Sequence, residues 1–162
     1  MSAHALLDSP VGPLTAVTDD GRSLVGLWFT DARHLPDPSR YGTRDDTVLP
    51  DLREQLDEYW AGRRRRFEVA LATVGTPFQQ QVWQALLDVP YGSTCSYGDL
   101  AVAVGRPTAV RAVGAANGRN PVCIVVPCHR VVGATGALTG YSGGVERKRA
   151  LLDLEQQRAR LC

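Results

Sequence analysis

The chain has 162 residues, 44% of them hydrophobic, and a net charge of +1. This length suffices for one globular unit or two small ones. No apolar run is long enough to span a bilayer, and the first residues lack the basic start and apolar stretch of a signal peptide. We therefore expect a cytoplasmic protein that has no membrane partner.

The charge is unevenly distributed along the chain. Residues 1–75 hold nine arginines against twelve acidic residues, whereas residues 76–162 hold nine basic against five acidic residues. The second half thus has the positive net charge expected of a nucleic-acid-binding face, although a solvated surface without a partner would show the same excess of basic residues.

The first half has the pattern of strands and one helix. Two apolar runs, Leu14 to Val17 and Leu24 to Phe29, flank Asp-Asp-Gly, which predicts a β-hairpin. Residues 50–61 keep helical spacing and end at Gly62, a residue typical of the position after a helix. Residues 67–71 alternate between apolar and polar or small side chains as a strand does, and the four arginines before them indicate a solvated loop or strand edge.

The second half is predominantly helical. Thr76-Pro77-Phe78-Gln79 is a helix start with a capping box. Ser96 begins a short helix that runs to about Val104 and breaks at Gly105, and a third helix follows from Pro107 or Thr108 to Asn117. Two short helices around a glycine-containing turn predict a helix-turn-helix. A last helix is expected over residues 145–158.

Between these helices, an apolar run delivers Cys128 and His129 side by side to an expected polar edge. A thiol beside an imidazole is how proteins make a sulfur nucleophile, because the thiolate reacts and a histidine can take its proton. The pattern is equally compatible with a core cysteine beside an incidental histidine.

The order and spacing of the motifs in this half resemble the O6-alkylguanine-DNA alkyltransferase family, whose members repair DNA by moving an alkyl group from a damaged base to their own cysteine. The motifs are Phe78-Gln79, Val82-Trp83, Pro90-Tyr91-Gly92, Ser96-Tyr97-Gly98, Arg111-Ala112-Val113-Gly114, Asn120-Pro121, Pro127-Cys128-His129-Arg130-Val131 and Gly140-Tyr141-Ser142-Gly143-Gly144. The first half resembles the family only in its element pattern.

The resemblance implies an α/β protein in two parts. Residues 1–75 would form a supporting strand-and-helix domain. Residues 76–162 would form a mainly helical domain that carries the helix-turn-helix and transfers the alkyl group. The implied partner is double-stranded DNA with alkylated bases, bound through its minor groove by a protein that is monomeric in solution.

The resemblance also assigns the residues that carry out the reaction. Cys128 matches the alkyl acceptor, His129 the group that relays its proton through a water, and Glu155 the acid that orients the histidine. Asn120 matches a hinge residue, and Tyr97 a hydrogen-bond donor to the flipped base. Each of these last three residues also has an ordinary structural interpretation. Glu155 would be an exposed charge on a helix, Asn120 would form a plain Asn-Pro turn, and Tyr97 would be a packed aromatic residue.

Arg111 matches the finger that replaces the base extruded from the duplex, although a phosphate contact is an alternative role. Tyr141 and Ser142 match a lid that borders the base pocket. Small residues around the finger would let the helix approach DNA closely, or would serve core packing: Ala109, Ala112, Gly114 and Ala115.

No cofactor or metal is implied. The segment between Cys123 and the Cys128-His129 pair is apolar and no second ligand pair follows, which argues against zinc. Cys95, Cys123 and Cys162 are expected to be free thiols, and Cys162 to be mobile.

Two other classes of function remain open. The first is a module that binds lesions without repairing them, as alkyltransferase-like relatives without the cysteine do. The second is a cysteine hydrolase built on Cys128, His129 and Glu155. The sequence does not rank alkyl groups by size, and activity on O4-alkylthymine stays an open expectation.

Overall fold

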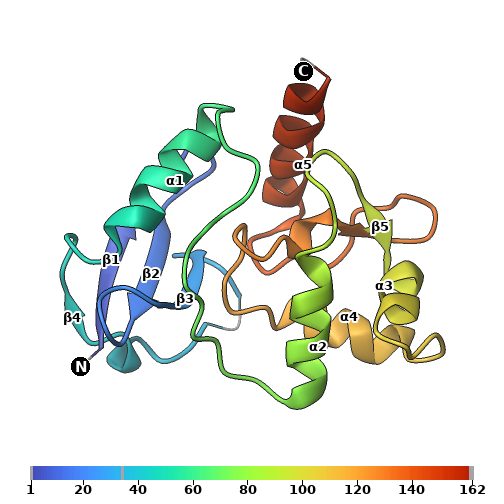
Figure 1. Ribbon diagram of the computed structural model, residues 1–162, viewed down its shortest axis with the longest axis horizontal. Coiled ribbons are helices and arrows are strands. Elements are labelled where there is room, and N and C mark those ends of the chain that lie inside the picture. The colour runs from blue at the N-terminus through green and yellow to red at the C-terminus, as the bar shows by residue number, and fades with distance from the viewer. Residues whose placement is uncertain (1, 34, 161–162) are drawn as a thin grey trace. The chain divides into compact units, whose positions relative to one another are not determined.

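The computed structural model describes residues 2–33 and 35–160. The chain divides between Thr73 and Val74 into two compact units, whereas the sequence pattern places the boundary two residues later, before Thr76. The first unit is a sheet with one long helix, and the second is mainly helical (Figure 1). The predicted α/β class, with its helical second part, is confirmed.

The first unit is organised around a four-stranded sheet in the order β3-β2-β1-β4. The pairs β1–β2 and β2–β3 are antiparallel, and β1–β4 is parallel. The predicted hairpin is present, and the Asp20 carboxylate in its turn accepts the backbone N–H groups of Arg22 and Ser23 at 2.9 and 2.6 Å. The strands are β1 (Ala3–Leu7), β2 (Leu14–Thr18), β3 (Leu24–Phe29) and β4 (Thr43–Arg44).

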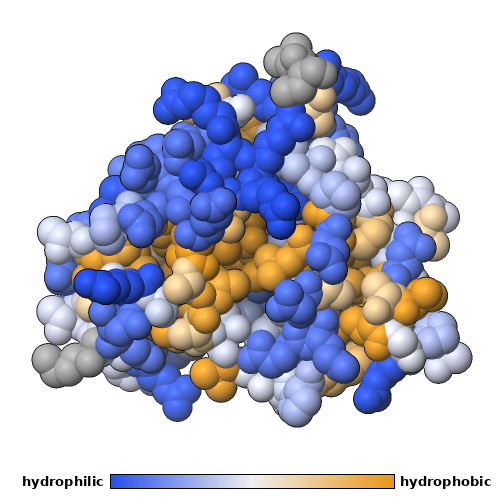
Figure 2. Space-filling model, viewed as in Figure 1, coloured by the Kyte–Doolittle hydropathy of each residue, from blue (hydrophilic) through white to orange (hydrophobic). Residues whose placement is uncertain are grey.

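Helix α1 (Pro50–Trp60) lies across this sheet (Figure 1). Its inner face buries Leu52, Leu56 and Tyr59, while its outer surface is hydrophilic (Figure 2). Gly62 follows the helix with φ of 77°, the left-handed conformation that glycine adopts at little cost, so the predicted helix end is confirmed.

The predicted strand over residues 67–71 is wrong. Only Leu71 forms a bridge, to Leu24. The Gln55 amide of α1 bonds both backbone groups of Glu68, at 2.8 and 3.2 Å. A side chain therefore occupies the backbone groups that a neighbouring strand would need.

The second unit follows the predicted helix starts. Capping boxes are present at Thr76 with Gln79 and at Ser96 with Asp99. A parallel pair of two-residue strands, which the sequence analysis did not predict, joins the start of α3 to the segment after Cys128. The elements are α2 (Pro77–Leu86), β5 (Cys95–Ser96), α3 (Tyr97–Ala103), α4 (Val110–Gly118), η2 (Cys128–Arg130), β6 (Val131–Val132) and α5 (Val145–Ala159).

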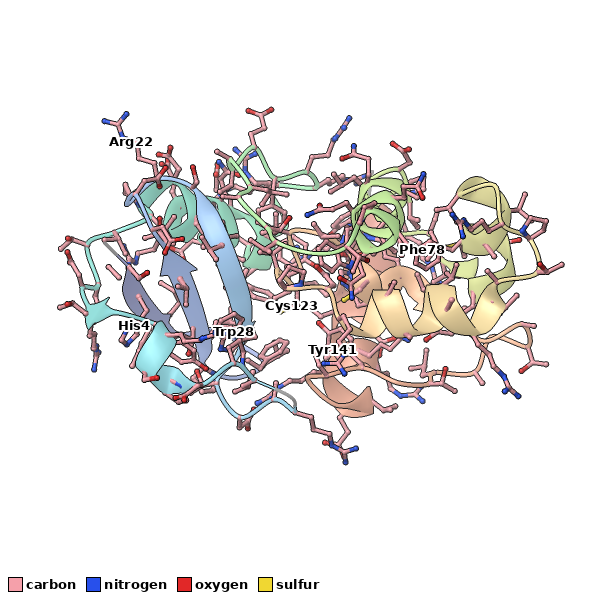
Figure 3. The ribbon with its side chains drawn as sticks, turned by 90° about the horizontal axis from the view of Figure 1, so that it is seen from below. His4, Arg22, Trp28, Phe78, Cys123 and Tyr141 are labelled. Carbon is pink, nitrogen blue, oxygen red and sulfur yellow. The ribbon has the colours of Figure 1, made fainter. Side chains whose placement is uncertain are left out.

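Helices α3 and α4 form the predicted helix-turn-helix, with Gly105 at φ of 75° in the turn. Helix α4 starts two to three residues later than predicted, and Ala109 at its N-cap offers no side-chain hydrogen bond. The turn packs on α2, because the Arg106 guanidinium lies 5.2 Å from the centre of the Phe78 ring. Phe78 itself is labelled in Figure 3. Within the described residues, no helix is both long and apolar enough to cross a membrane.

Candidate active site

The segment from Val122 to Val132 is buried along its whole length and leads the chain from α4 to Cys128. It begins with a tight turn in which Ile124 adopts a φ of 73°, unusual for a β-branched residue. Asn120 closes this turn with both amide groups: its Nδ2 donates to the Val126 carbonyl at 2.8 Å, and its Oδ1 accepts the Val122 N–H at 3.1 Å. The geometry fits a hinge between the helix-turn-helix and the cysteine.

Cys128 opens the short helical turn η2 and is only 5% exposed. The expectation that the apolar run delivers it to a polar edge is wrong, because Cys128 and the residues on both sides of it are buried. Burial raises the pKa of Cys128, whereas a hydrogen bond with the Asn120 side chain and the charge of Lys148 act to lower it. Burial prevails, so the resting thiol is protonated at neutral pH.

His129 is completely buried next to the thiol-bearing residue. Its Nε2 lies 2.8 Å from Oε2 of Glu155. Since a carboxylate only accepts, Nε2 carries the proton and Nδ1 is left as an acceptor. Among the described residues, no protein group bonds Nδ1. Burial lowers the pKa of His129 despite the opposing effect of Glu155, so the resting ring is a neutral base.

Glu155 is fully buried in α5, so the exposed-charge alternative for this residue is wrong. Besides His129 it bonds Arg130, whose Nε reaches Oε1 at 2.8 Å and whose Nη2 reaches Oε2 at 3.0 Å. Burial alone would raise the pKa of Glu155, but hydrogen bonds and charges from His129 and Arg130 lower it to about 2. The carboxylate is therefore ionised throughout the physiological range.

Two basic residues of this site received no role in the sequence analysis. Arg130 also donates to the Val89 carbonyl at 2.7 Å and lies 5.7 Å from the centre of the Tyr91 ring. Lys148 is fully buried in α5, and its Nζ donates to the Thr139 carbonyl at 2.8 Å. Its charge favours the thiolate form of Cys128.

A sequence signal for Lys148 existed. Lys148 and Glu155 are seven residues apart, and Leu151 and Leu152 lie between them, so the four share one helical face. A lysine and a glutamate on a face otherwise apolar indicate buried charges. Arg130 had no comparable signal, since its burial depends on the position of Glu155.

Tyr97 begins α3 near this cluster, half-buried and 5.9 Å from Lys148 Nζ, measured to the ring centre. Its hydroxyl donates to the Thr139 carbonyl at 3.3 Å. Tyr141 is buried and Ser142 half-buried in the glycine-rich loop that leads into α5. These placements leave the predicted substrate roles of Tyr97, Tyr141 and Ser142 as predictions.

Helix α4 presents the predicted DNA-facing residues to solvent. Arg111 is exposed, while the inward side of the helix buries Val113, Ala116 and Asn117. The small residues proposed to permit close approach are all exposed or half-buried: Ala109, Ala112, Gly114 and Ala115. An exposed stripe of small side chains is open to a macromolecular partner, whereas core packing would have buried it.

Two of the remaining thiols lie near the cysteine turn in sequence or pairing: Cys123 is in the buried segment before Cys128, and Cys95 is in β5, which pairs with β6. Within the described residues, Cys95 and Cys123 form no disulfide, and burial raises the pKa of Cys95. Cys162 lies outside the described residues. No group of three or more His, Cys, Asp or Glu side chains within residues 2–33 and 35–160 is arranged to hold a metal ion.

Together, the site holds a buried thiol, the neutral imidazole of the next residue and an ionised carboxylate bonded to that imidazole. Such a set of groups can move a proton from sulfur to imidazole, because the carboxylate stabilises the imidazolium that forms. It lies beside a helix-turn-helix whose second helix exposes an arginine and small residues. The arrangement is suited to a sulfur nucleophile that acts on DNA.

Comparison with protein families agrees with this description. Residues 77–157 match the 6-O-methylguanine DNA methyltransferase DNA-binding domain, and residues 3–73 match the ribonuclease-like domain of the same family. The chain belongs to the 6-O-methylguanine DNA methyltransferase family. Similar curated proteins are the methylated-DNA–protein-cysteine methyltransferases of Mycobacterium tuberculosis, 49% identical over 98% of this chain and 95% of the relative, and of Mycobacterium leprae, 50% identical over 93% and 90%.

Solved structures of this methyltransferase family share the fold. The crystal structure of the M. tuberculosis O6-methylguanine methyltransferase matches with a TM-score of 0.90 at 50% identity, covering 98% of this chain and 94% of that one. The M. tuberculosis protein in complex with DNA matches with a TM-score of 0.92 at 49% identity, covering 96% and 94%. A family member with this fold has therefore been crystallised on DNA.

The buried carboxylate of this methyltransferase predicts a specific acid sensitivity. Because the pKa of Glu155 is lower in the folded than in the unfolded state, its stabilisation is complete above about pH 4.5 and is lost as the pH falls toward 2. We expect a loss of about 3 kcal/mol in unfolding free energy over that range. Urea unfolding followed by circular dichroism at several pH values measures it.

Glu155→Gln is the matched variant for this measurement. It should be about 3–5 kcal/mol less stable at pH 7, because Arg130 loses its buried partner. Its stability should also depend less steeply on pH below 4.5. Parallel curves for the two proteins would show that other carboxylates carry the acid sensitivity.

Proposed function

We propose that the chain repairs DNA by transferring the alkyl group of O6-alkylguanine to Cys128 in a single turnover. The observation that carries the proposal is a buried Cys128 followed by His129, which is bonded to the buried Glu155, in the same unit as a helix-turn-helix with an exposed arginine. The relatives named above support it, since their names describe a methylated-DNA–protein-cysteine methyltransferase.

The chemistry follows from the protonation states. His129 takes the thiol proton through a water at Nδ1, and Glu155 stabilises the imidazolium. The thiolate attacks the alkyl carbon, so that an S–C bond forms and the C–O6 bond breaks with its electron pair moving to guanine, which then takes a proton. The product thioether has no good leaving group, so Cys128 is consumed.

Reaction at O6 requires the base to leave the stack, because the atom is inaccessible within the duplex. In this proposal α4 docks in the minor groove, and its small exposed residues allow close approach. Arg111 enters the gap left by the base. A minor-groove mode suits a repair protein that must act regardless of local sequence.

The flipped base would be bordered by Tyr97, Tyr141 and Ser142. Tyr97 would transfer its hydrogen bond from the Thr139 carbonyl to the base, since its hydroxyl is already placed as a donor at 3.3 Å. The Gly140 to Gly144 loop would act as the lid. O4-alkylthymine is a second substrate to be tested, and we expect a monomeric protein in the cytoplasm.

One experiment separates this function from its two rivals. The protein is incubated with alkylated duplex and its intact mass is measured. Transfer adds one alkyl group per molecule and then stops. A protein that only binds lesions stays unmodified, and a cysteine hydrolase turns over without a lasting adduct.

Replacing Cys128 with Ala should abolish transfer and leave binding to alkylated duplex nearly unchanged, because the thiol makes the new bond and does not hold the DNA. Intact mass and a binding titration measure the two effects. Cys123→Ala is the control and should still form the adduct. An adduct on Cys95, Cys123 or Cys162 at the wild-type rate would refute the assignment.

Arg111→Ala should slow transfer from duplex much more than transfer from a free alkylguanine base. A finger offsets the unpairing cost, on the order of a few kcal/mol, and a free base has nothing to unpair. Single-turnover rates with the two substrates measure the difference. Arg149→Ala, an exposed arginine on α5, serves as the control. Equal losses with both substrates would assign Arg111 to fold stability.

Glu155→Gln should slow transfer and move the rate–pH profile to higher pH, because the imidazolium loses its partner and less thiolate forms. The same change should have little further effect in His129→Ala, since the two residues act as one unit. The measurement is a double-mutant cycle on the transfer rate at temperatures where circular dichroism shows folded protein. Additive losses would mean that Glu155 acts independently of the histidine.

A further inference from the structure

Asn117 is a buried amide on the helix proposed to read DNA. It lies in the last turn of α4, six residues after Arg111, and is only 3% exposed. Its neighbours on the buried side of the helix are apolar, Val113 and Ala116. A polar side chain on such a face needs an explanation beyond packing.

The amide makes one hydrogen bond, to the nucleophile's own residue. Nδ2 donates to the Cys128 carbonyl at 3.5 Å, a long bond between two buried groups. Oδ1 is also buried, and no group of the described residues bonds it. A buried amide oxygen without a protein partner contributes less to folding stability than one that is bonded within the protein.

The nearby Asn120 shows what a stabilising amide looks like in this fold. Both of its amide groups are bonded, at 2.8 and 3.1 Å, and they close a backbone turn. The Asn117 side chain closes no turn within the described residues. The Cys128 carbonyl also accepts the Val131 N–H, so it would stay bonded without Asn117. Stability therefore does not account for an asparagine at this position.

We propose that Asn117 is a positioning residue for the transfer reaction, which ties the Cys128 backbone to the DNA-reading helix. This hydrogen bond fixes the distance between α4 and the Cys128 sulfur. Helix α4 would hold the duplex, and the sulfur must approach the alkyl carbon in line with the bond that breaks. Small displacements of a nucleophile from its attack geometry lower rate strongly. This inference rests on the proposed function.

The test compares Asn117→Leu with Asn117→Ala in single-turnover transfer from alkylated duplex. Both variants should lower the maximal rate by about five- to tenfold, as expected for one lost hydrogen bond at a reacting residue. The DNA concentration for half-maximal rate and the midpoint of the rate–pH profile should stay unchanged. The melting temperature should rise in the Leu variant and fall in the Ala variant, which leaves a cavity.

Val113→Ala is the control, because it opens a cavity on the same buried face of α4 without removing a hydrogen bond to the Cys128 segment. It should lower the melting temperature and keep nearly the wild-type maximal rate. Unchanged rates in both Asn117 variants would overturn the proposal, as would rates that simply follow the melting temperatures. A changed half-maximal concentration would make Asn117 a DNA-binding residue instead. If the wild-type protein forms no adduct, the proposed function itself fails.

Discussion

The ionised carboxylate of Glu155 is the group on which the second unit depends. It is buried where an unpaired charge would be prohibitive, and it is stable there because it accepts from Arg130 at both oxygens and from His129 at one. Arg130 in turn donates to the Val89 carbonyl, at the end of the segment that follows α2. One carboxylate thus links the last helix, the cysteine turn and the chain after α2.

The same charge sets the protonation states of the reacting groups. It holds the His129 proton on Nε2, which directs the basic Nδ1 away from the carboxylate. Lys148 adds a positive charge that favours a thiolate at Cys128, while burial opposes it. Reactivity is therefore a balance between a low-polarity environment and three charged side chains, all in the core.

The secondary structure was predictable from the sequence wherever it depends on residues close together in the chain. The two capping boxes, the hairpin turn and Gly62 each act within a few residues, so the helices and the first strands were predictable. The strand expected at residues 67–71 failed because Gln55, thirteen positions before Glu68, takes both backbone bonds of Glu68, which leaves only the Leu71 bridge to β3. The start of α4 was placed too early, since Ala109 gives no capping signal.

The site was predictable in its residues but not in its environment. The motif order pointed to Cys128, His129 and Glu155, yet the cysteine was expected at a polar edge and is buried. Arg130 and Lys148 were missed because a charged side chain is buried only where a bonding partner lies beside it, and here those partners are distant in the sequence. Asn117 was missed because the hydrogen bond that its side chain makes among the described residues runs to Cys128, eleven positions away.

The protonated state of the buried thiol has a consequence for the lifetime of an unused molecule. A protein that is consumed in one transfer must keep its thiol intact until it meets an alkylated base. Exposed thiolates are lost to oxidants and to stray electrophiles, because both attack the ionised, accessible sulfur. At 5% exposure and with burial raising its pKa, Cys128 is protected from both during storage. Burial in this fold thus slows the chemical loss of a thiol that can react with DNA only once.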